Sequence, residues 1–393
     1  MFLQDQIKIS DKNHFPCMQP WVTNFVRLDG SVTCCTQNST NIGNLNNQNI
    51  IEIWNSDEIK NVRKHISAGD YKKAGCDNEC PFLRGSYNKV THSPPSSELI
   101  LPLIDYTKNS NTKYSKNINL VLEDYNEQKL EVKGLPVYTD VLWNEKCNAA
   151  CIHCNQDHKS ELKVSDKVKD ALKERIPYSN YLRFQGGEVF MEKTFLDFFQ
   201  EISRIKKYPF FKRYLITNGS FLNDRLIEKL LNNSEKLKIL FSIDSVVKEN
   251  FKQIRVNLKF ERVVSAITKL ANLTKQKKFD LTLNYCVMDK NLSELKEACN
   301  FAKAHNIKIN FAAIQHDFGN VNFFYKNKAE LKKIKNLLND IKNYADKIKL
   351  DYSGFEGLIA RLNNAISGIG YKNAPNKNFL VSKIKFFIKY VKP

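Results

Sequence analysis

Cys147-Asn148-Ala149-Ala150-Cys151-Ile152-His153-Cys154 is the stretch around which the chain is organised. Its three cysteines follow the spacing C-x3-C-x2-C, and thiolates placed in this way hold three corners of a [4Fe–4S] cube. Such a cube normally takes four thiolates, so this site leaves one iron open to a small molecule. A zinc site and three unrelated core cysteines are the alternatives. Structural zinc needs a fourth protein ligand. His153 lies between Cys151 and Cys154 and cannot easily turn back to bind the metal that these cysteines would hold.

Length and composition limit the classes of protein to consider. The 393 residues are enough for two domains, or for one large domain with an appendage. We find neither a signal-like start nor a stretch long enough to cross a bilayer, and we expect a soluble, cytoplasmic protein. Ten cysteines in a reducing compartment then predict metal ligands and not disulfides. The formal charge of +19 comes mostly from scattered lysines without interleaved aromatic residues, so no dedicated nucleic-acid binding is expected.

Residues 10–85 form a first unit with its own cysteines. We expect a strand over 23–28, a hairpin turn at Asp29-Gly30, Cys34 and Cys35 on the return strand, and a helix over 50–65. Such a unit is too small to be stable without a metal. Four thiolates for a closed cluster are available from Cys17, Cys35, Cys76 and Cys80. Structural zinc is the alternative metal, and Cys34 could replace Cys35 as a ligand.

Residues 86–136 have the composition of a linker, with turn residues at 93–97, a polar run at 108–117 and an edge strand expected within 120–130. From Val137 on, short apolar strands alternate with amphipathic helices, which predicts a parallel α/β fold. Strands are expected near 138–144, 180–185, 212–217, 237–243, 279–288 and 307–314, and helices near 165–175, 193–206, 222–233, 258–275 and 291–306. Six strands predict a partial (β/α)6 barrel over 137–316, and not a complete barrel of eight.

Polar features follow four successive strands of this barrel. The cysteine triplet follows the first strand and Gly186-Gly187-Glu188 the second. Thr217-Asn218-Gly219 follows the third strand, and Ser242-Ile243-Asp244 ends the fourth. The carboxyl ends of parallel strands meet at one edge of the sheet, where ligands bind in such folds. We therefore expect one site at this edge.

These motifs together resemble those of the radical S-adenosylmethionine (radical SAM) enzymes, over about residues 137–316. The resemblance implies that Cys147, Cys151 and Cys154 hold a catalytic [4Fe–4S] cluster, whose open iron binds the amine and carboxylate of S-adenosylmethionine. It implies cofactor contacts from Gly186, Gly187, Glu188, Asn218, Ser242, Asp244, Arg255 and His153. His153 replaces the aromatic residue usual before the third cysteine, and Val189 replaces the proline that commonly follows the glycine pair and glutamate. A surface or capping role is the alternative for Arg255.

The first unit resembles the SPASM/twitch modules that carry auxiliary clusters in this superfamily. Cys17, Gly30, Cys35, the run 42–45 and the run 52–54 match the pattern. Two departures stand out. The module precedes the barrel, whereas it usually follows it, and only Cys76 and Cys80 end the pattern. The resemblance therefore implies one auxiliary [4Fe–4S] cluster and not two.

Residues 317–393 form a basic extension with 15 Lys or Arg and five Asp or Glu from 321 onward. Amphipathic helices are expected over 331–348, 355–369 and 378–391, packed on the barrel with solvated outer faces. The last of them is also a candidate for contact with an anionic membrane surface or a partner.

The resemblance implies an enzyme that cleaves S-adenosylmethionine to a 5′-deoxyadenosyl radical and abstracts hydrogen from an unactivated C–H bond. Oxidation or epimerisation of a peptide, sugar or other small molecule is expected, with an electron donor such as flavodoxin or ferredoxin. Cys286 is a candidate hydrogen-atom donor in the epimerisation, and a small buried hydrophobe otherwise. Gln315 and His316 are candidates for substrate contact. A non-catalytic iron–sulfur protein and an RNA-modifying radical SAM enzyme are the alternatives.

Overall fold

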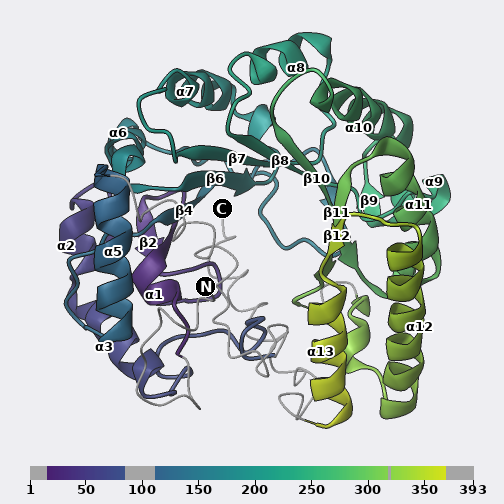
Figure 1. The fold of residues 1–393 in the computed structure, drawn as a ribbon, viewed down its shortest axis with the longest axis horizontal. Helices are drawn as coiled ribbons and strands as arrows, with labels where there is room; N and C mark the ends of the chain where they lie inside the picture. Colours follow the sequence, from purple (N-terminus) through teal and green to yellow (C-terminus); the bar gives the residue numbers. More distant parts are fainter. Residues whose placement is uncertain (1–15, 85–110, 317–319, 369–393) are drawn as a thin grey trace, which may run out of the picture.

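A curved ten-stranded sheet is the framework of the computed structural model, which describes residues 16–84, 111–316 and 320–368. The strand order is β12-β11-β10-β8-β7-β6-β4-β1-β2-β3. Figure 1 shows the sheet as an arch, with helices along its outer face. The expected α/β fold, with a small module ahead of a partial barrel, is confirmed.

The six expected barrel strands form the parallel centre of the sheet. They are β4 (Tyr138–Asn144), β6 (Tyr181–Gly186), β7 (Lys212–Thr217), β8 (Leu237–Ser242), β10 (Asp280–Val287) and β11 (Lys308–Ala313), with the short β12 (Tyr352–Ser353) beyond them. Successive side chains of a strand point to opposite faces of the sheet, so every second side chain points outward to the helices. Phe184 of β6, for example, packs against Phe195, Phe198 and Phe199 of one helix, with ring centroids 5.6, 6.0 and 5.7 Å away.

The outer helices also lie close to their expected positions. They are α6 (Asp166–Arg175), α7 (Lys193–Ser203), α8 (Asp224–Leu231), α10 (Phe260–Thr274) and α11 (Leu295–His305). Ser165 and Asn223 accept hydrogen bonds from the first turns of α6 and α8, which fixes where these helices begin. The seven-residue α9 (Lys248–Ile254) and the two-stranded sheet of β5 (Ala150–Cys151) and β9 (Arg255–Val256) were not expected.

The N-terminal module shares the main sheet and is not a separate layer. It consists of α1 (Gln19–Val22), β1 (Thr23–Val26), β2 (Ser31–Thr33), β3 (Gly43–Asn44), α2 (Ile50–Trp54) and α3 (Asp57–Ser67). β1 runs parallel to β4, with Phe25 opposite Asp140, while β2 pairs antiparallel with β1 and β3 pairs antiparallel with β2. The return strand β2 ends before Cys34 and Cys35, which were expected on it. The module therefore shares its core with the barrel.

The expected linker contains a packed helix. Residues 85–110 lie outside the described part, but α5 (Lys113–Asn126) occupies much of the remainder. The edge strand expected within 120–130 is therefore wrong. Tyr114, Ile118, Val121 and Tyr125 of α5 are buried at helical spacing, which is the pattern that favours a helix over a strand here. The boundaries of the four expected sequence units remain predictions.

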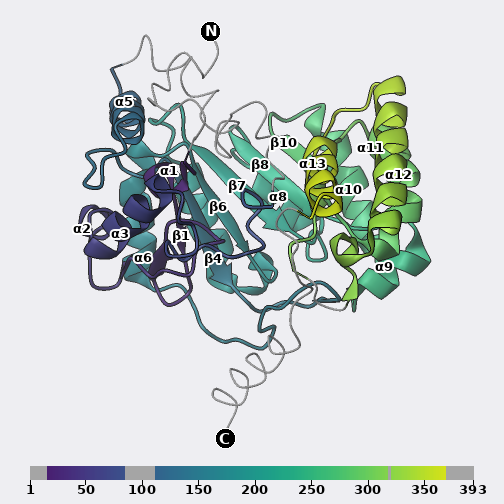
Figure 2. The same ribbon diagram turned by 90° about the horizontal axis from the view of Figure 1, so that it is seen from below.

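The described C-terminal part has two helices, α12 (Lys328–Lys347) and α13 (Phe355–Ile366), as expected. Figures 1 and 2 show them side by side at the opposite end of the sheet from α1–α3. The expected helix over 378–391 lies outside the described residues. Among the helices described, none has the length and apolar character needed to cross a membrane.

Candidate functional site

The cysteine triplet lies in a loop after β4 and is fixed by the small second sheet. β5 and β9 pair antiparallel, which places Cys151 opposite Arg255. The N–H of Ile152 also donates to the carbonyl of Ile254 at 3.1 Å. The loop is therefore attached to the chain that follows α9, about 100 residues further on.

The three cysteines line a cavity of about 420 Å³ at the carboxyl ends of the strands. Most of the expected cofactor residues share this wall: His153, Gly186, Gly187, Asn218, Ser242, Asp244 and Arg255. Cys286, Gln315 and His316 line it too. The expectation of one site at this edge of the sheet is thus matched by a single cavity, which Glu188 does not line.

Several N–H groups point at the thiols of the triplet. The backbone N–H of Ala149 lies 3.4 Å from Sγ of Cys147, and Nδ2 of Asn218 lies 3.8 Å from the same sulfur. Nη1 of Arg255 lies 3.6 Å from Sγ of Cys151. N–H donors of this kind stabilise thiolates and tune the clusters that thiolates hold.

Gly186 and Gly187 are required by the backbone of the cysteine loop itself. Gly186 has φ +154°, and a Cβ there would lie 2.0 Å from the carbonyl oxygen of Asn144. A Cβ on Gly187 would lie 2.2 Å from the carbonyl oxygen of Lys146. The two glycines therefore let the end of β6 pass against the chain that leads into the triplet. This backbone contact is a reason for the two glycines beside the cofactor contacts that the resemblance implies.

Glu188 lies behind the cavity wall and is completely buried. Its carboxylate accepts hydrogen bonds from Oγ1 of Thr217 at 2.8 and 3.0 Å and from the N–H of Asn218 at 2.8 Å. Burial raises the pKa of Glu188 from 4.5 to about 7, and these hydrogen bonds oppose the rise. In this structure Glu188 therefore holds the end of β7, and with it Asn218, in place.

Asp244 is the acidic centre of the cavity and is also completely buried. Its Oδ2 lies 2.6 Å from Nη2 of Arg255 and 3.3 Å from Nε2 of His153. Its Oδ1 accepts a hydrogen bond from the N–H of Cys286 at 2.8 Å. Arg255 is itself only 8% exposed, so a surface or capping role does not describe it.

Sequence reasoning missed three asparagines that support the site. Nδ2 of Asn291 donates to the carbonyl oxygens of Asp244 and Cys286, at 2.8 Å each. Oδ1 of Asn148 accepts a hydrogen bond from Nδ2 of Asn218 at 3.2 Å, and Nδ2 of Asn144 donates to the carbonyl of Glu188 at 3.0 Å. Asn148 lies within the triplet and Asn144 ends β4, so the sequence motifs could have pointed to both as site residues. No feature of the sequence around Asn291 pointed to it.

The N-terminal cysteines form the second group. Burial raises the pKa of the Cys17 thiol well above its usual value, and repulsion from Cys35, Cys80 and Cys76 adds to the rise, because the four sulfurs lie near one another. Nδ2 of Asn38 donates to Sγ of Cys76 at 3.8 Å.

Cys34 differs from these four in its surroundings. It is 2% exposed and packs in the hydrophobic core, whereas Cys35 is half-buried beside the other ligand candidates. The thiol of Cys34 is hydrogen-bonded to Cys35; this bond and burial raise the pKa of Cys34, and the same bond lowers the pKa of Cys35. The geometry favours Cys35 over Cys34 as the ligand.

The donor sets agree with two iron–sulfur clusters. All ten cysteines are free thiols, and seven of them form the two groups, each with at least one N–H donor aimed at a sulfur. Nε of Arg255 and Nδ1 of His153 are buried in the cavity wall without a partner among the described residues. These atoms are available to a ligand. No three His, Cys, Asp or Glu side chains in the described part of the chain stand close enough to hold a single metal ion.

Comparison with protein families places both groups of cysteines in known domains. Residues 141–302 match the radical SAM superfamily, and residues 17–81 match the iron–sulfur cluster-binding SPASM domain. The chain carries a radical SAM domain. The SPASM domain lies ahead of it in the sequence, as expected. Together the two domains imply a catalytic and an auxiliary [4Fe–4S] cluster and binding of S-adenosylmethionine.

Solved structures of similar fold are more distant. SuiB of Streptococcus suis is 14% identical, with a TM-score of 0.45, and the match covers 71% of this chain and 64% of that one. Native anSMEcpe with bound AdoMet is 21% identical, with a TM-score of 0.41, over 53% of this chain and 60% of that one. The matched region thus spans less than two thirds of these proteins. No curated protein matches the sequence.

Proposed function

We propose that this radical SAM enzyme cleaves S-adenosylmethionine reductively at the cysteine triplet and removes a hydrogen atom from an unactivated C–H bond of a substrate in the cavity. The observation that carries the proposal is the shared wall of this cavity, where the triplet meets the side chains expected to bind the cofactor. When bound, the cluster and S-adenosylmethionine supply the electron and the 5′-deoxyadenosyl radical.

The chain's own residues would hold and orient these groups. Cys147, Cys151 and Cys154 would ligate three irons, and the guanidinium of Arg255 offsets the negative charge at Cys151. Asn218, Ser242 and Asp244 present an amide, a hydroxyl and a carboxylate to the cavity, which are groups that bind ribose hydroxyls and an ammonium. Glu188 would act indirectly, by fixing Asn218.

Oxidation of the substrate is the first candidate for the overall reaction. Four thiolates from Cys17, Cys35, Cys76 and Cys80 would leave the auxiliary cluster no open iron, so its proposed role is to accept an electron and not to bind substrate. An external donor such as flavodoxin or ferredoxin would supply the catalytic cluster with electrons. The cavity wall also offers the amides of Asn284 and Gln315, which suits a polar substrate such as a peptide or a small molecule.

Epimerisation is the second candidate, and the position of Cys286 favours it. Cys286 lines the same cavity as the triplet. Packing as a small buried hydrophobe is its alternative role. A thiol there could return a hydrogen atom to the substrate. Deuterated water separates the candidates once a substrate is known: solvent deuterium in the product, lost in Cys286→Ala, supports epimerisation. A product two hydrogens lighter without solvent label supports oxidation.

Anaerobic cleavage of S-adenosylmethionine tests the proposal. Reconstituted protein with dithionite should form 5′-deoxyadenosine, and replacing Cys147, Cys151 and Cys154 with Ala should abolish it. Undiminished cleavage in the triple variant would contradict the proposal and favour a non-catalytic iron–sulfur protein. Specific turnover of RNA and not of peptides or small molecules would instead support the RNA-modifying alternative.

A further inference from the structure

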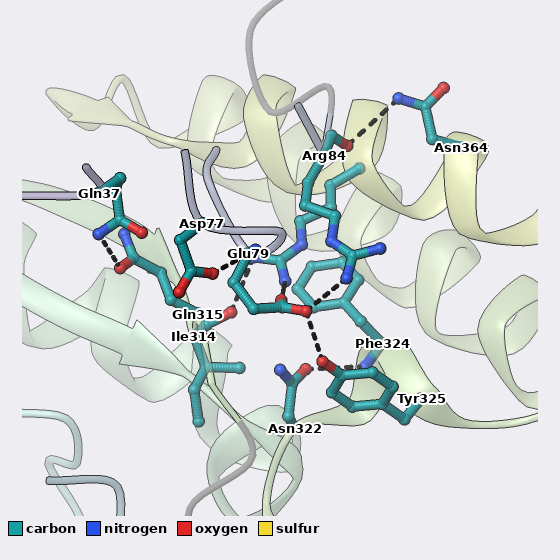
Figure 3. A network of polar contacts seen from close by, with 11 residues as sticks. Gln37, Asp77, Glu79, Arg84, Ile314, Gln315, Asn322, Phe324, Tyr325 and Asn364 are labelled. Atoms are coloured by element: carbon teal, nitrogen blue, oxygen red, sulfur yellow. Dashed lines mark hydrogen bonds and ion pairs between the residues drawn. The ribbon is translucent and has the colours of Figure 1, made fainter. Parts of the chain in front are cut away.

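Glu79 lies between Cys76 and Cys80, and its carboxylate is held by Arg84 of the module and by residues of the C-terminal part. It is 8% exposed. Its Oε1 lies 2.5 Å from Nη2 of Arg84 and accepts a hydrogen bond from the hydroxyl of Tyr325 at 2.6 Å. Its Oε2 lies 2.9 Å from Nη2 of Arg361. Figure 3 shows Arg84 and Tyr325 beside the carboxylate of Glu79; Tyr325 belongs to η7 (Phe323–Tyr325), and Arg361 belongs to α13.

Arg361 links the carboxylate of Glu79 to the wall of the cavity. Its guanidinium is fully buried and lies over the ring of Phe324, 4.1 Å from the centroid. Its Nη1 donates to the carbonyl of Ile314 at 2.8 Å, and Ile314 lines the cavity. One buried guanidinium thus bridges Glu79 and the end of β11.

The other ligand loop of the module reaches the same place. Gln37, two residues after Cys35, donates from Nε2 to Oε1 of Gln315 at 2.9 Å. Gln315 lines the cavity next to Ile314. The carbonyl of Gln37 also accepts a hydrogen bond from the N–H of Asp77 at 2.8 Å, which connects the two ligand loops. One ligand loop therefore contacts this edge of the cavity through Gln37, and the other is linked to it through Arg361.

Burial sets the Glu79 contacts apart from the module's other ion pairs. Lys60–Glu131 and Lys73–Asp70 have side chains that are 30 to 77% exposed, and such pairs contribute little. A buried carboxylate between two guanidinium groups is different, because removing its charge takes one ion-pair partner from each of two buried cations. The position of the 76–80 loop therefore depends on the Glu79 carboxylate.

We propose that Glu79 is the positioning residue of the auxiliary cluster: it fixes the Cys76–Cys80 loop, and the cluster with it, at the edge of the substrate cavity. This rests on the proposed function, which takes that cluster as the acceptor of an electron from the substrate. In that step the substrate radical would lose one electron, which the cluster would take up, and one proton, which would pass to solvent. Glu79 touches neither substrate nor cofactor and acts through the two ligands beside it.

The test needs neither substrate nor S-adenosylmethionine. In the full chain with Cys147, Cys151 and Cys154 replaced by Ala, only the module's cluster remains. Glu79→Gln in this background should change its EPR spectrum and speed the removal of its iron by a chelator at least tenfold. Glu79→Asp, which restores the charge, should recover part of the loss, and Tyr325→Phe, which keeps both ion pairs, should have a smaller effect. Glu58→Gln is the matched control, since Glu58 is an exposed acid of the same module.

The possible outcomes separate failure of the inference about Glu79 from failure of the proposed function. If the unaltered protein holds two clusters and Glu79→Gln leaves the spectrum and the chelation rate unchanged, the inference is overturned and the proposed function stands. If the unaltered module holds zinc or no metal, the electron-accepting role and the inference fail together. If Glu79→Gln does not fold, the soluble Glu79→Asp and Tyr325→Phe variants replace it, and unaltered spectra and chelation rates in both overturn the inference.

Discussion

Arg255 connects three parts of the site through one buried guanidinium. It lies opposite Cys151 in the β5–β9 pair, donates toward the sulfur of Cys151 and forms an ion pair with Asp244. A cation this close to a thiolate ligand favours the more negative, reduced state of a cluster. From this contact we expect Arg255 to tune the cluster, and it is also a candidate for cofactor binding.

Replacing Arg255 with Met should make the midpoint potential of the catalytic cluster more negative. We expect a shift on the order of 60 mV, the one-electron equivalent of about 1.4 kcal/mol of lost stabilisation. Redox titration followed by EPR, without S-adenosylmethionine, measures it. Arg262→Met is the control, because Arg262 is an exposed arginine of α10. Equal midpoint potentials in the Arg255→Met and Arg262→Met variants would contradict this role of Arg255.

Glu188 should make stability depend on pH. Its folded pKa of about 7 lies above the usual 4.5, so between these values the folded protein keeps a proton that the unfolded chain releases. The free energy of unfolding should therefore fall as pH rises from 4.5 to 7 and level off above, by an amount on the order of 2 to 3 kcal/mol. Glu188→Gln should flatten this slope. Urea titrations at several pH values measure it, and an unchanged slope would contradict the buried, protonated carboxyl.

The helix α5 is the element that binds the expected linker to the fold. Oδ2 of Asp124 accepts hydrogen bonds from the N–H groups of Lys133 and Gly134, at 2.8 and 2.7 Å. A Cβ on Gly134 would lie 2.7 Å from the backbone nitrogen of Val121. The loop after α5 thus packs directly on the helix backbone.

Gly134→Ala should destabilise the protein by about 2 kcal/mol or more, because neither backbone can move without breaking these contacts. Lys133→Ala, which alters an exposed side chain of the same loop, should have little effect. Chemical denaturation of both variants measures the difference. Equal stabilities would mean that α5 is loosely attached.

Elements with a local signal were predictable, and those set by distant pairing were not. The barrel strands could be predicted from their outward apolar residues, such as Leu182 and Phe184. An edge strand was expected within 120–130, but Val121 and Tyr125 belong to a helical stripe that begins at Tyr114. Pairing of β1 with β4 depends on residues more than 100 positions apart, and no local pattern encodes it. At the site, the cysteines and strand-end residues were predictable, whereas the burial of Glu188 follows from packing.

At the scale of the whole molecule, the N-terminal module touches the barrel at both ends of its open sheet. β1 extends the sheet beside β4, and Glu79 meets Arg361 beyond β11 and β12. Figure 1 shows the module's chain passing from α3 toward α13 across the open side of the arch. The SPASM domain therefore bridges the partial barrel despite its unusual place in the sequence.

Metal content tests this two-domain account. Reconstituted protein should hold about eight irons and eight sulfides per chain, as two cubes require, and the Cys147/Cys151/Cys154→Ala variant about half. Replacing Cys17, Cys35, Cys76 and Cys80 with Ala should leave the complementary half. Elemental analysis and sulfide assay give the numbers. Zinc in the module would make it a structural element only.

The most direct test of the central claim is whether S-adenosylmethionine binds the open iron of the triplet's cluster. ENDOR spectroscopy of the reduced protein with cofactor labelled at the amino nitrogen and the carboxylate oxygen measures this. The account predicts coupling of both labels to the cluster in the unaltered protein and in the variant without the four module cysteines, and none in the triple variant. No coupling in the unaltered protein, or coupling that survives loss of Cys147, Cys151 and Cys154, would contradict it.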